Sequence, residues 1–275
     1  MKKTEINSSH KRLDSKTVLV TRARAQAEEM TVLLEGLGAK VIHVPTIEFI
    51  PPDDLAPLDN AIRRLEEYDW IIFTSSNAAD FFIKRLRESR SGVSLLGTAS
   101  VCAIGTATAR ALEEAGIRAN VVAQESTSEG VLRELAERIG GENIVRDLKI
   151  LIPRAKVARE ILPTRLRDLG AHVDVVETYQ TVLPQIKRSS LKKLFEETRI
   201  DVITFTSSST VSNLGALLGL TDLSGALKST LVACIGPVTA ETARRFGLTN
   251  IIQSDVYTAA ELVRVIATAI GEETK

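Results

Sequence analysis

The chain has 275 residues, of which 44% are hydrophobic and 25% are charged, values typical of a globular protein with a buried core. This length exceeds what one core usually holds, so we expect two domains. The 35 basic side chains balance the 35 acidic ones, which excludes a strong net field that would attract nucleic acid or an anionic membrane. An anionic ligand must therefore be bound by a few local groups.

The N-terminal residues 1–16 are polar and contain no apolar run of the length that a signal peptide needs, so we expect a flexible tail. No stretch of 18 consecutive apolar residues follows, which argues against a transmembrane helix and favours a cytoplasmic protein. Cys102 and Cys234 each lie in an apolar strand pattern rather than in a Cys-x-x-Cys pair. We expect both thiols to be buried and reduced.

An internal repeat with an offset of 131 or 132 residues dominates the rest of the chain. It aligns Arg22 with Arg154, Gly38 with Gly170, and the tripeptide Thr-Ser-Ser with an identical tripeptide. Such a period predicts two copies of one structural unit. The matched ranges, which occur in the same order in both copies, are 18–49 with 150–181, 68–77 with 200–209, and 101–117 with 232–248.

Within each copy, short β-branched runs alternate with stretches whose apolar residues recur every three or four positions, which predicts alternating strands and helices. Alternating order implies parallel sheets, and fully apolar strands imply helices on both faces. The predicted fold class is α/β, with two flavodoxin-like, doubly wound parallel-sheet domains. In the first copy we expect strands at 18–21, 41–44, 70–74, 101–105 and 120–123, and helices at about 24–37, 55–67, 77–88, 106–115 and 128–139, several ending at glycines such as Gly38 and Gly116.

Small hydroxyl residues and glycine follow the predicted strands, and the carboxyl ends of parallel strands are where such sheets bind ligands. The first N–H groups of the following helices lack partners, so a carboxylate or phosphate binds well there. Helix capping alone also explains Ser and Thr at any single turn. The same triplet with an arginine in both copies favours binding. The candidates are Arg22, Thr74, Ser75, Ser76, Asn77 and Gly105, their partners Arg154, Thr206, Ser207 and Gly236, and also Thr127 and Thr258.

Signatures of several other chemistries are missing from the sequence. His10 lies in the tail, and His43 and His172 lie in strand segments without a second ligand at metal spacing, so no metal site is predicted. There is no phosphate-binding loop motif and no Ser-His-Asp or Cys-His set. We therefore expect no cofactor.

Five segments together resemble the uroporphyrinogen-III synthase family over residues 17–270. They are VTRARAQA, FTSSNAA, AIGTATARAL, VDVVETYQT and CIGPVTAETA. The resemblance implies an enzyme that closes hydroxymethylbilane, a linear tetrapyrrole, into uroporphyrinogen III. Water is lost and the last pyrrole ring is inverted through a spiro intermediate. It further implies domains formed by residues 1–46 plus 181–275 and by 47–180, a two-stranded connector, and a ligand-binding cleft between the domains.

The resemblance also assigns roles to single residues. Tyr179 matches the family tyrosine and is expected to assist departure of the substrate hydroxyl, although an aromatic residue packed at the domain junction is the alternative. Thr108 and Thr239 match the family threonines and are expected to bind carboxylates. Arg22 and Arg154 are candidates for the same task or for structural ion pairs.

Two departures from the family pattern and one rival function remain open. Ala155 stands where many relatives have glycine, and the second copy reads FTSSST without an asparagine. The expected partner is the small-molecule substrate, with no nucleic acid and no membrane, and we expect a monomer. A non-catalytic tetrapyrrole or polyanion sensor of the same fold is the alternative function.

Overall fold

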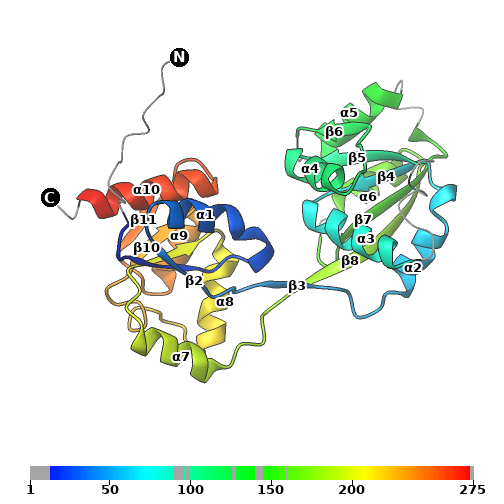
Figure 1. Cartoon of the computed structure of the whole chain (residues 1–275). Coiled ribbons are helices and arrows are strands. Elements are labelled where there is room, and N and C mark those ends of the chain that lie inside the picture. The colour runs from blue at the N-terminus through cyan, green and yellow to red at the C-terminus, as the bar shows by residue number, and fades with distance from the viewer. Residues whose placement is uncertain are drawn as a thin grey trace, which may run out of the picture. The chain divides into compact units, whose positions relative to one another are not determined.

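The computed structural model describes residues 13–89, 96, 99–125, 128–139, 145–158 and 160–272. The chain forms two compact units: unit 1 comprises Met1–Glu48 and Val182–Lys275, and unit 2 comprises Phe49–Thr181. The chain leaves unit 1 in strand β3 (Glu48–Ile50) and returns in β8 (His172–Val182), and these two strands are neighbours in one sheet (Figure 1).

Unit 1 is built on a five-stranded sheet with the order β11-β10-β9-β1-β2, and its paired strands run parallel. Its elements in chain order are β1 (Thr17–Val20), the 3-10 helix η1 (Arg24–Gln26), α1 (Glu28–Gly36), β2 (Lys40–His43), α7 (Arg188–Glu197), β9 (Val202–Phe205), α8 (Ser208–Leu218), β10 (Leu231–Cys234), α9 (Pro237–Arg245), β11 (Ile251–Gln253) and α10 (Ala259–Glu272).

Helices cover both faces of this sheet, as the apolar strands predict. Along β9, Val202 packs with α1 and α10, whereas Ile203 and Phe205 pack with α7, α8 and α9, so successive side chains enter opposite cores. The predicted tail is wrong for residues 13–16. Leu13 is fully buried in the α1 and α10 core and its N–H donates to the carbonyl of Leu37, so the folded unit begins before β1.

Unit 2 has a six-stranded sheet with the order β3-β8-β7-β4-β5-β6. Trp70 and Ile72 of β4 face one core and Ile71 and Phe73 face the other. The remaining elements are α2 (Ala56–Arg63), the 3-10 helix η2 (Leu65–Glu67), β4 (Trp70–Phe73), α3 (Ser76–Glu88), β5 (Ser100–Ile104), α4 (Thr106–Glu114), β6 (Val121–Ala123), α5 (Ser128–Ile139), β7 (Lys149–Ala155) and α6 (Ile161–Asp168).

The two sheets exchange halves of the sequence repeat. In unit 1, β2 and β1 of the first copy continue into β9, β10 and β11 of the second. In unit 2, β8 and β7 of the second copy continue into β4, β5 and β6 of the first. The repeat therefore predicts the elements of each sheet but not their combination. The single strand β8 aligns with residues 40–50, which form the two strands β2 and β3.

Two smaller expectations about local structure are confirmed. Gly38 and Gly116 have φ angles of 92° and 85° just after α1 and α4, the left-handed conformation that ends a helix. Cys102 and Cys234 are fully buried, and burial raises the pKa of each thiol to about 12. Among the described residues no helix is long and apolar enough to cross a membrane.

Candidate functional site

In unit 1 the predicted residues gather at one edge of the sheet. Arg22 follows β1, Thr206 and Ser207 follow β9, and Gly236 follows β10; these three strands are adjacent and parallel, so their carboxyl ends lie side by side. Thr258 follows β11 and caps α10, because its Oγ1 accepts a hydrogen bond of 3.2 Å from the N–H of Glu261.

Unit 2 repeats this arrangement with the other halves of the repeat. Arg154 lies at the end of β7, Thr74–Asn77 at the end of β4, and Gly105 at the end of β5, three adjacent parallel strands. Thr127 lies outside the described residues. Each unit thus presents its own strand-end turns, and the sequence predicts both sets.

The matched serines Ser75 and Ser207 cap their helices. Ser75 Oγ accepts a hydrogen bond of 3.2 Å from the N–H of Ala78 at the start of α3. Ser207 Oγ accepts one of 3.4 Å from the N–H of Thr210, whose hydroxyl accepts one from the N–H of Ser207, a reciprocal capping box. The capping role therefore holds at both turns.

Tyr179 is held between two phenylalanine rings, and its phenol reaches the turn before α3. Its ring stacks on Phe81 at 5.6 Å between centroids and meets the edge of Phe49 at 5.5 Å. Only 8% of the residue is exposed, and its Oη lies 3.5 Å from Ser75 Oγ. These contacts fix the ring on both sides. The phenol oxygen therefore lies beside the turn at the N-terminus of α3.

A shift in strand register places Tyr179 there. The pairing of β7 with β8 is irregular between Arg154 and Ala155, so that Ala155 is opposite Tyr179 and Thr178 is passed over. The Thr178 hydroxyl instead donates a hydrogen bond of 3.2 Å to the carbonyl of Arg154. Such an irregularity re-aims the side chains that follow it. Ala155, which stands where many relatives have glycine, thus lies at the irregularity that changes the register of β8.

Thr108 and Thr239 occupy the same place in the two copies, at the third position of α4 and of α9. They are 3% and 4% exposed, respectively. Within the described part of the chain, neither hydroxyl forms a hydrogen bond. Both hydroxyls are therefore available to a polar ligand that binds at these helix N-termini.

The two glycines that precede these helices differ in conformation. Gly105 has φ 81° and ψ 155°, a region that favours glycine, and its N–H donates to the carbonyl of Ala123. Gly236 has an extended backbone, with φ −178°. A β-carbon on Gly236 would lie 2.8 Å from Cε1 of Tyr257. The repeat therefore keeps glycine at both positions for different physical reasons.

This difference predicts two different results for alanine substitution. Gly105→Ala is expected to lower the free energy of unfolding by about 1–3 kcal/mol through backbone strain, although no atom lies within 4 Å of the added carbon. Gly236→Ala keeps an allowed backbone and only displaces the exposed Tyr257 ring, so stability changes little. Urea unfolding measures both, with the helical Gly36→Ala as a control expected to raise stability by about 0.5–1 kcal/mol. Equal stability of Gly105→Ala and wild type would contradict the strain argument.

The two candidate arginines have protein partners. Arg154 pairs with Glu160, and only 11% of its side chain is exposed, so the ion-pair alternative holds for this residue. Arg22 donates from Nε to Oε1 of Gln26 at 3.3 Å and remains partly exposed. Of the two, Arg22 is the better placed to meet an anion.

The sequence-based prediction missed a second polar group near Tyr179. Lys156 Nζ lies 2.9 Å from Asp53 Oδ2, and Gln180 Nε2 lies 2.9 Å from Asp53 Oδ1. The hydrogen bond from Lys156, followed by that from Gln180, lowers the pKa of Asp53. The N–H of Lys156 also donates to the carbonyl of Tyr179. The signal for this cluster is the basic residue two positions after Arg154.

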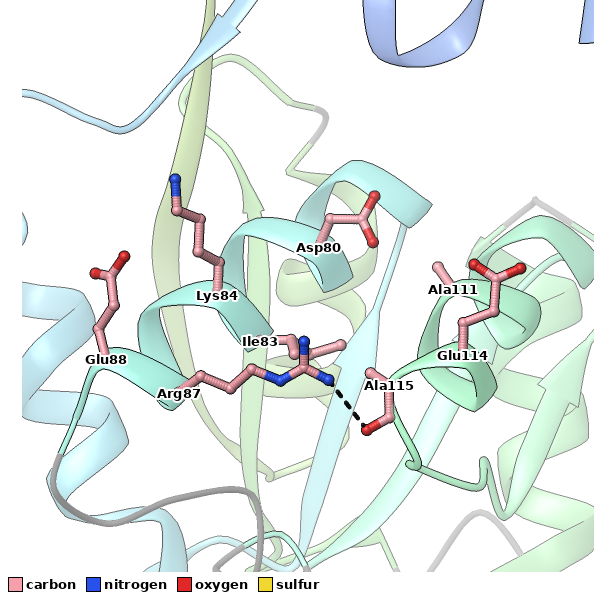
Figure 2. A pocket seen from close by; sticks show the side chains of 8 residues that line it. All are labelled: Asp80, Ile83, Lys84, Arg87, Glu88, Ala111, Glu114 and Ala115. Atoms are coloured by element: carbon pink, nitrogen blue, oxygen red, sulfur yellow. Dashed lines mark hydrogen bonds between the residues drawn. The ribbon is translucent and has the colours of Figure 1, made fainter. Parts of the chain in front are cut away.

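A cavity of about 400 Å³ lies between α3 and α4, away from these turns (Figure 2). Figure 2 shows Asp80, Lys84 and Arg87 on α3 and Glu114 on α4, with Arg87 donating to the carbonyl of Ala115. Burial, followed by the charge of Glu114, raises the pKa of Asp80. No predicted site residue lines this cavity. Among the described residues, no group of three or more His, Cys, Asp or Glu side chains is placed to hold a metal ion.

Comparison with known proteins identifies the family. A family model described as uroporphyrinogen-III synthase HemD matches residues 28–264. A putative uroporphyrinogen-III synthase of Methanothermobacter thermautotrophicus is 32% identical over 92% of this chain and 98% of its own length. The uroporphyrinogen-III synthase of Synechococcus elongatus is 30% identical over 92% of this chain and 95% of its own length. A solved uroporphyrinogen-III synthetase structure from Helicobacter pylori has the same fold, with a TM-score of 0.58 and 17% identity. The match covers 92% of this chain and 99% of that one. The chain belongs to the uroporphyrinogen-III synthase family.

Proposed function

We propose that this chain is a uroporphyrinogen-III synthase, which converts hydroxymethylbilane to uroporphyrinogen III without a cofactor. The observation that best supports this proposal is the position of Tyr179. Its side chain is buried, and its phenol oxygen lies 3.5 Å from Ser75 Oγ at the N-terminus of α3. It places a hydroxyl donor next to a helix N-terminus, a position that favours negative charge. This is the combination that a reaction with a departing hydroxyl and several carboxylates needs.

In the proposed reaction the bond between the terminal methylene carbon and its hydroxyl breaks, and the hydroxyl leaves as water after gaining a proton. The electron-poor carbon that results is attacked by the substituted carbon of the last pyrrole, which gives a spiro intermediate. The original bond from this pyrrole to its neighbour's methylene carbon then breaks, and that methylene carbon bonds to the other, unsubstituted α-carbon, so the ring is inverted as the macrocycle closes. This α-carbon loses its proton, which balances the proton taken up by the leaving hydroxyl. The first step needs a hydrogen-bond donor at the leaving oxygen, and Tyr179 is proposed for this role.

The protein's larger contribution is to hold the two ends of the substrate in the geometry for attack. Closure without inversion needs no protein, so the choice of product depends on proximity and orientation. The substrate carboxylates are proposed to meet the turns bearing Ser76, Asn77, Thr108 and Thr239, together with Arg22. Charge-assisted hydrogen bonds contribute about 1.5–3 kcal/mol each, so several are needed for micromolar affinity after the cost of association.

We further propose that residues 1–46 plus 181–275 and residues 47–180 act as two substrate-binding domains, each contributing its strand-end turns. The protein is proposed to act as a monomer in the cytoplasm. All of the residues proposed for the reaction lie within this one chain.

The test supplies the purified protein with freshly made hydroxymethylbilane, oxidises the products and separates the porphyrin isomers. The type III isomer is expected to exceed the type I isomer, whereas a reaction without protein gives type I. Heat-denatured protein serves as the control for adventitious catalysis. Formation of the type I isomer alone, at the rate of the buffer, would overturn the proposed activity and leave a binding protein of the same fold.

A further inference from the structure

An exposed aromatic side chain lies at the ligand-binding edge of unit 1. Tyr257 is 66% exposed, whereas Tyr68 and Tyr179, the other two tyrosines of the chain, are buried. It follows β11, which pairs in parallel with β10, so it lies at the carboxyl ends of the strands beside Gly236. Val238 in the first turn of α9 is also exposed. Apolar surface is thus presented where the sequence predicts polar binding groups.

The ring of Tyr257 packs closely against the backbone at Gly236. A β-carbon built on Gly236 would lie 2.8 Å from Cε1, 3.1 Å from Cδ1 and 3.5 Å from Cζ of Tyr257. The extended backbone of Gly236 would accept any residue, so glycine is needed here for the close approach of this ring. One side of the ring is therefore supported by the backbone, while most of the side chain remains open to solvent.

The groups around this ring combine an apolar surface with an unused polar group. Gly236 is the N-cap of α9, whose nine residues end with Arg245. Thr239 in its first turn is 4% exposed, and its hydroxyl forms no hydrogen bond with another described residue. A flat apolar ring that carries a carboxylate would satisfy both features at once. A pyrrole ring with its acetate or propionate chain has this chemistry.

We propose that Tyr257 is a substrate-positioning residue, on whose exposed surface one pyrrole ring of the linear tetrapyrrole packs. A carboxylate of that ring meets the N-terminus of α9 and the hydroxyl of Thr239. This inference rests on the proposed function and assigns it a residue outside the predicted set. The ring surface, not the phenol hydroxyl, provides the contact, and the contact is made equally in the ground state and the transition state.

Replacing Tyr257 therefore affects KM more than kcat. Tyr257→Ala is expected to raise KM for hydroxymethylbilane about 3- to 10-fold, the range of one aromatic contact, with kcat within about twofold of wild type. Tyr257→Phe keeps the ring surface and is expected to retain the wild-type KM. Gly236→Ala is expected to resemble Tyr257→Ala, because its methyl group displaces the ring.

The matched control is Val32→Ala. Val32 lies on α1 of the same unit and is 63% exposed, close to the exposure of Tyr257, so its loss should leave KM unchanged. Circular dichroism of each variant establishes that it is folded. A KM for Tyr257→Ala equal to that of wild type, or an equal rise for Val32→Ala, overturns the inference.

A binding measurement separates this inference from the proposed activity. Wild type and Tyr257→Ala are titrated with uroporphyrin III, and binding is followed by quenching of Trp70, the single tryptophan. Weaker binding by Tyr257→Ala supports the inference even if wild type forms no type III isomer. Equal affinities together with equal KM values overturn it while the type III activity of wild type stands.

Discussion

Tyr179→Phe is expected to lower kcat about 100-fold, the lower end of the range for a lost proton donor, with little change in KM. The phenylalanine ring keeps the stacking on Phe81 and the edge contact with Phe49, so the fold should be preserved. Only the oxygen that lies 3.5 Å from Ser75 Oγ is lost. Initial rates of type III formation at several substrate concentrations separate kcat from KM.

Tyr68→Phe provides a matched control in the same unit. Tyr68 is also buried, but its hydroxyl donates to Asp174 Oδ2 at 2.5 Å, away from the strand-end turns. Burial, followed by the bond to Asp174, raises the pKa of this phenol well above its usual value. Loss of the Tyr68 hydroxyl should lower the free energy of unfolding by about 1.5–3 kcal/mol and leave kcat unchanged. A Tyr179→Phe enzyme with full activity would remove this tyrosine from the proposed mechanism.

Phe82→Ala is expected to destabilise unit 2 by about 3–5 kcal/mol, because it removes a fully buried ring and leaves a cavity. Phe82 meets Phe73 edge-on at 5.4 Å, in the core formed by α3 and β4. Hydrogen exchange should rise in β4 and β5. A comparable core change in unit 1, Phe205→Ala, should instead raise exchange in β9 and β10. Equal loss of protection in both units for either variant would show that they unfold as one cooperative body.

The strands and helices follow from local patterns and could be predicted from the sequence. The predicted strand at 70–74 is observed at Trp70–Phe73, and the predicted helix at 106–115 is observed at Thr106–Glu114. The strand is a short run of consecutive apolar residues, the helix has apolar residues at helical spacing, and each ends at a small or polar residue. Residues 13–16 were misjudged because Leu13 is a single apolar residue in a polar stretch, and its burial depends on distant helices.

The exchange of halves between the sheets could not be derived from the same patterns. Parallel pairing depends on contacts between residues far apart in the sequence, such as Val18 with Val202, and both copies contain equally suitable strands. The exchange of strands between the two sheets was expected only from the family resemblance. The periodicity of apolar residues predicted the individual strands and helices, not which of them share a sheet.

The site was predicted in part for a similar reason. Ser75 and Ser207 follow identical strand endings, and the repeat finds them directly. The aromatic cluster has no counterpart in the other copy, since Tyr179 aligns with Ile47 and Phe81 aligns with Asn213. In unit 1, Asn213 donates to the carbonyl of Thr46 instead. Features unique to one copy give no internal signal, so Phe49, Phe81 and Tyr257 were missed.

The shared strands have a consequence for how the chain can be divided. A break at the repeat boundary near residue 148 would separate β4 from its neighbour β7 and β1 from its neighbour β9, so neither fragment would carry a whole sheet. With this connectivity, a chain that contained a single copy could form complete sheets only as a pair. In each sheet the last three strands of one chain would lie beside the first strands of the other. The present connectivity is the one that an end-to-end fusion of two such strand-exchanged polypeptides would give, with a tyrosine at position 179 and an isoleucine at the matching position 47.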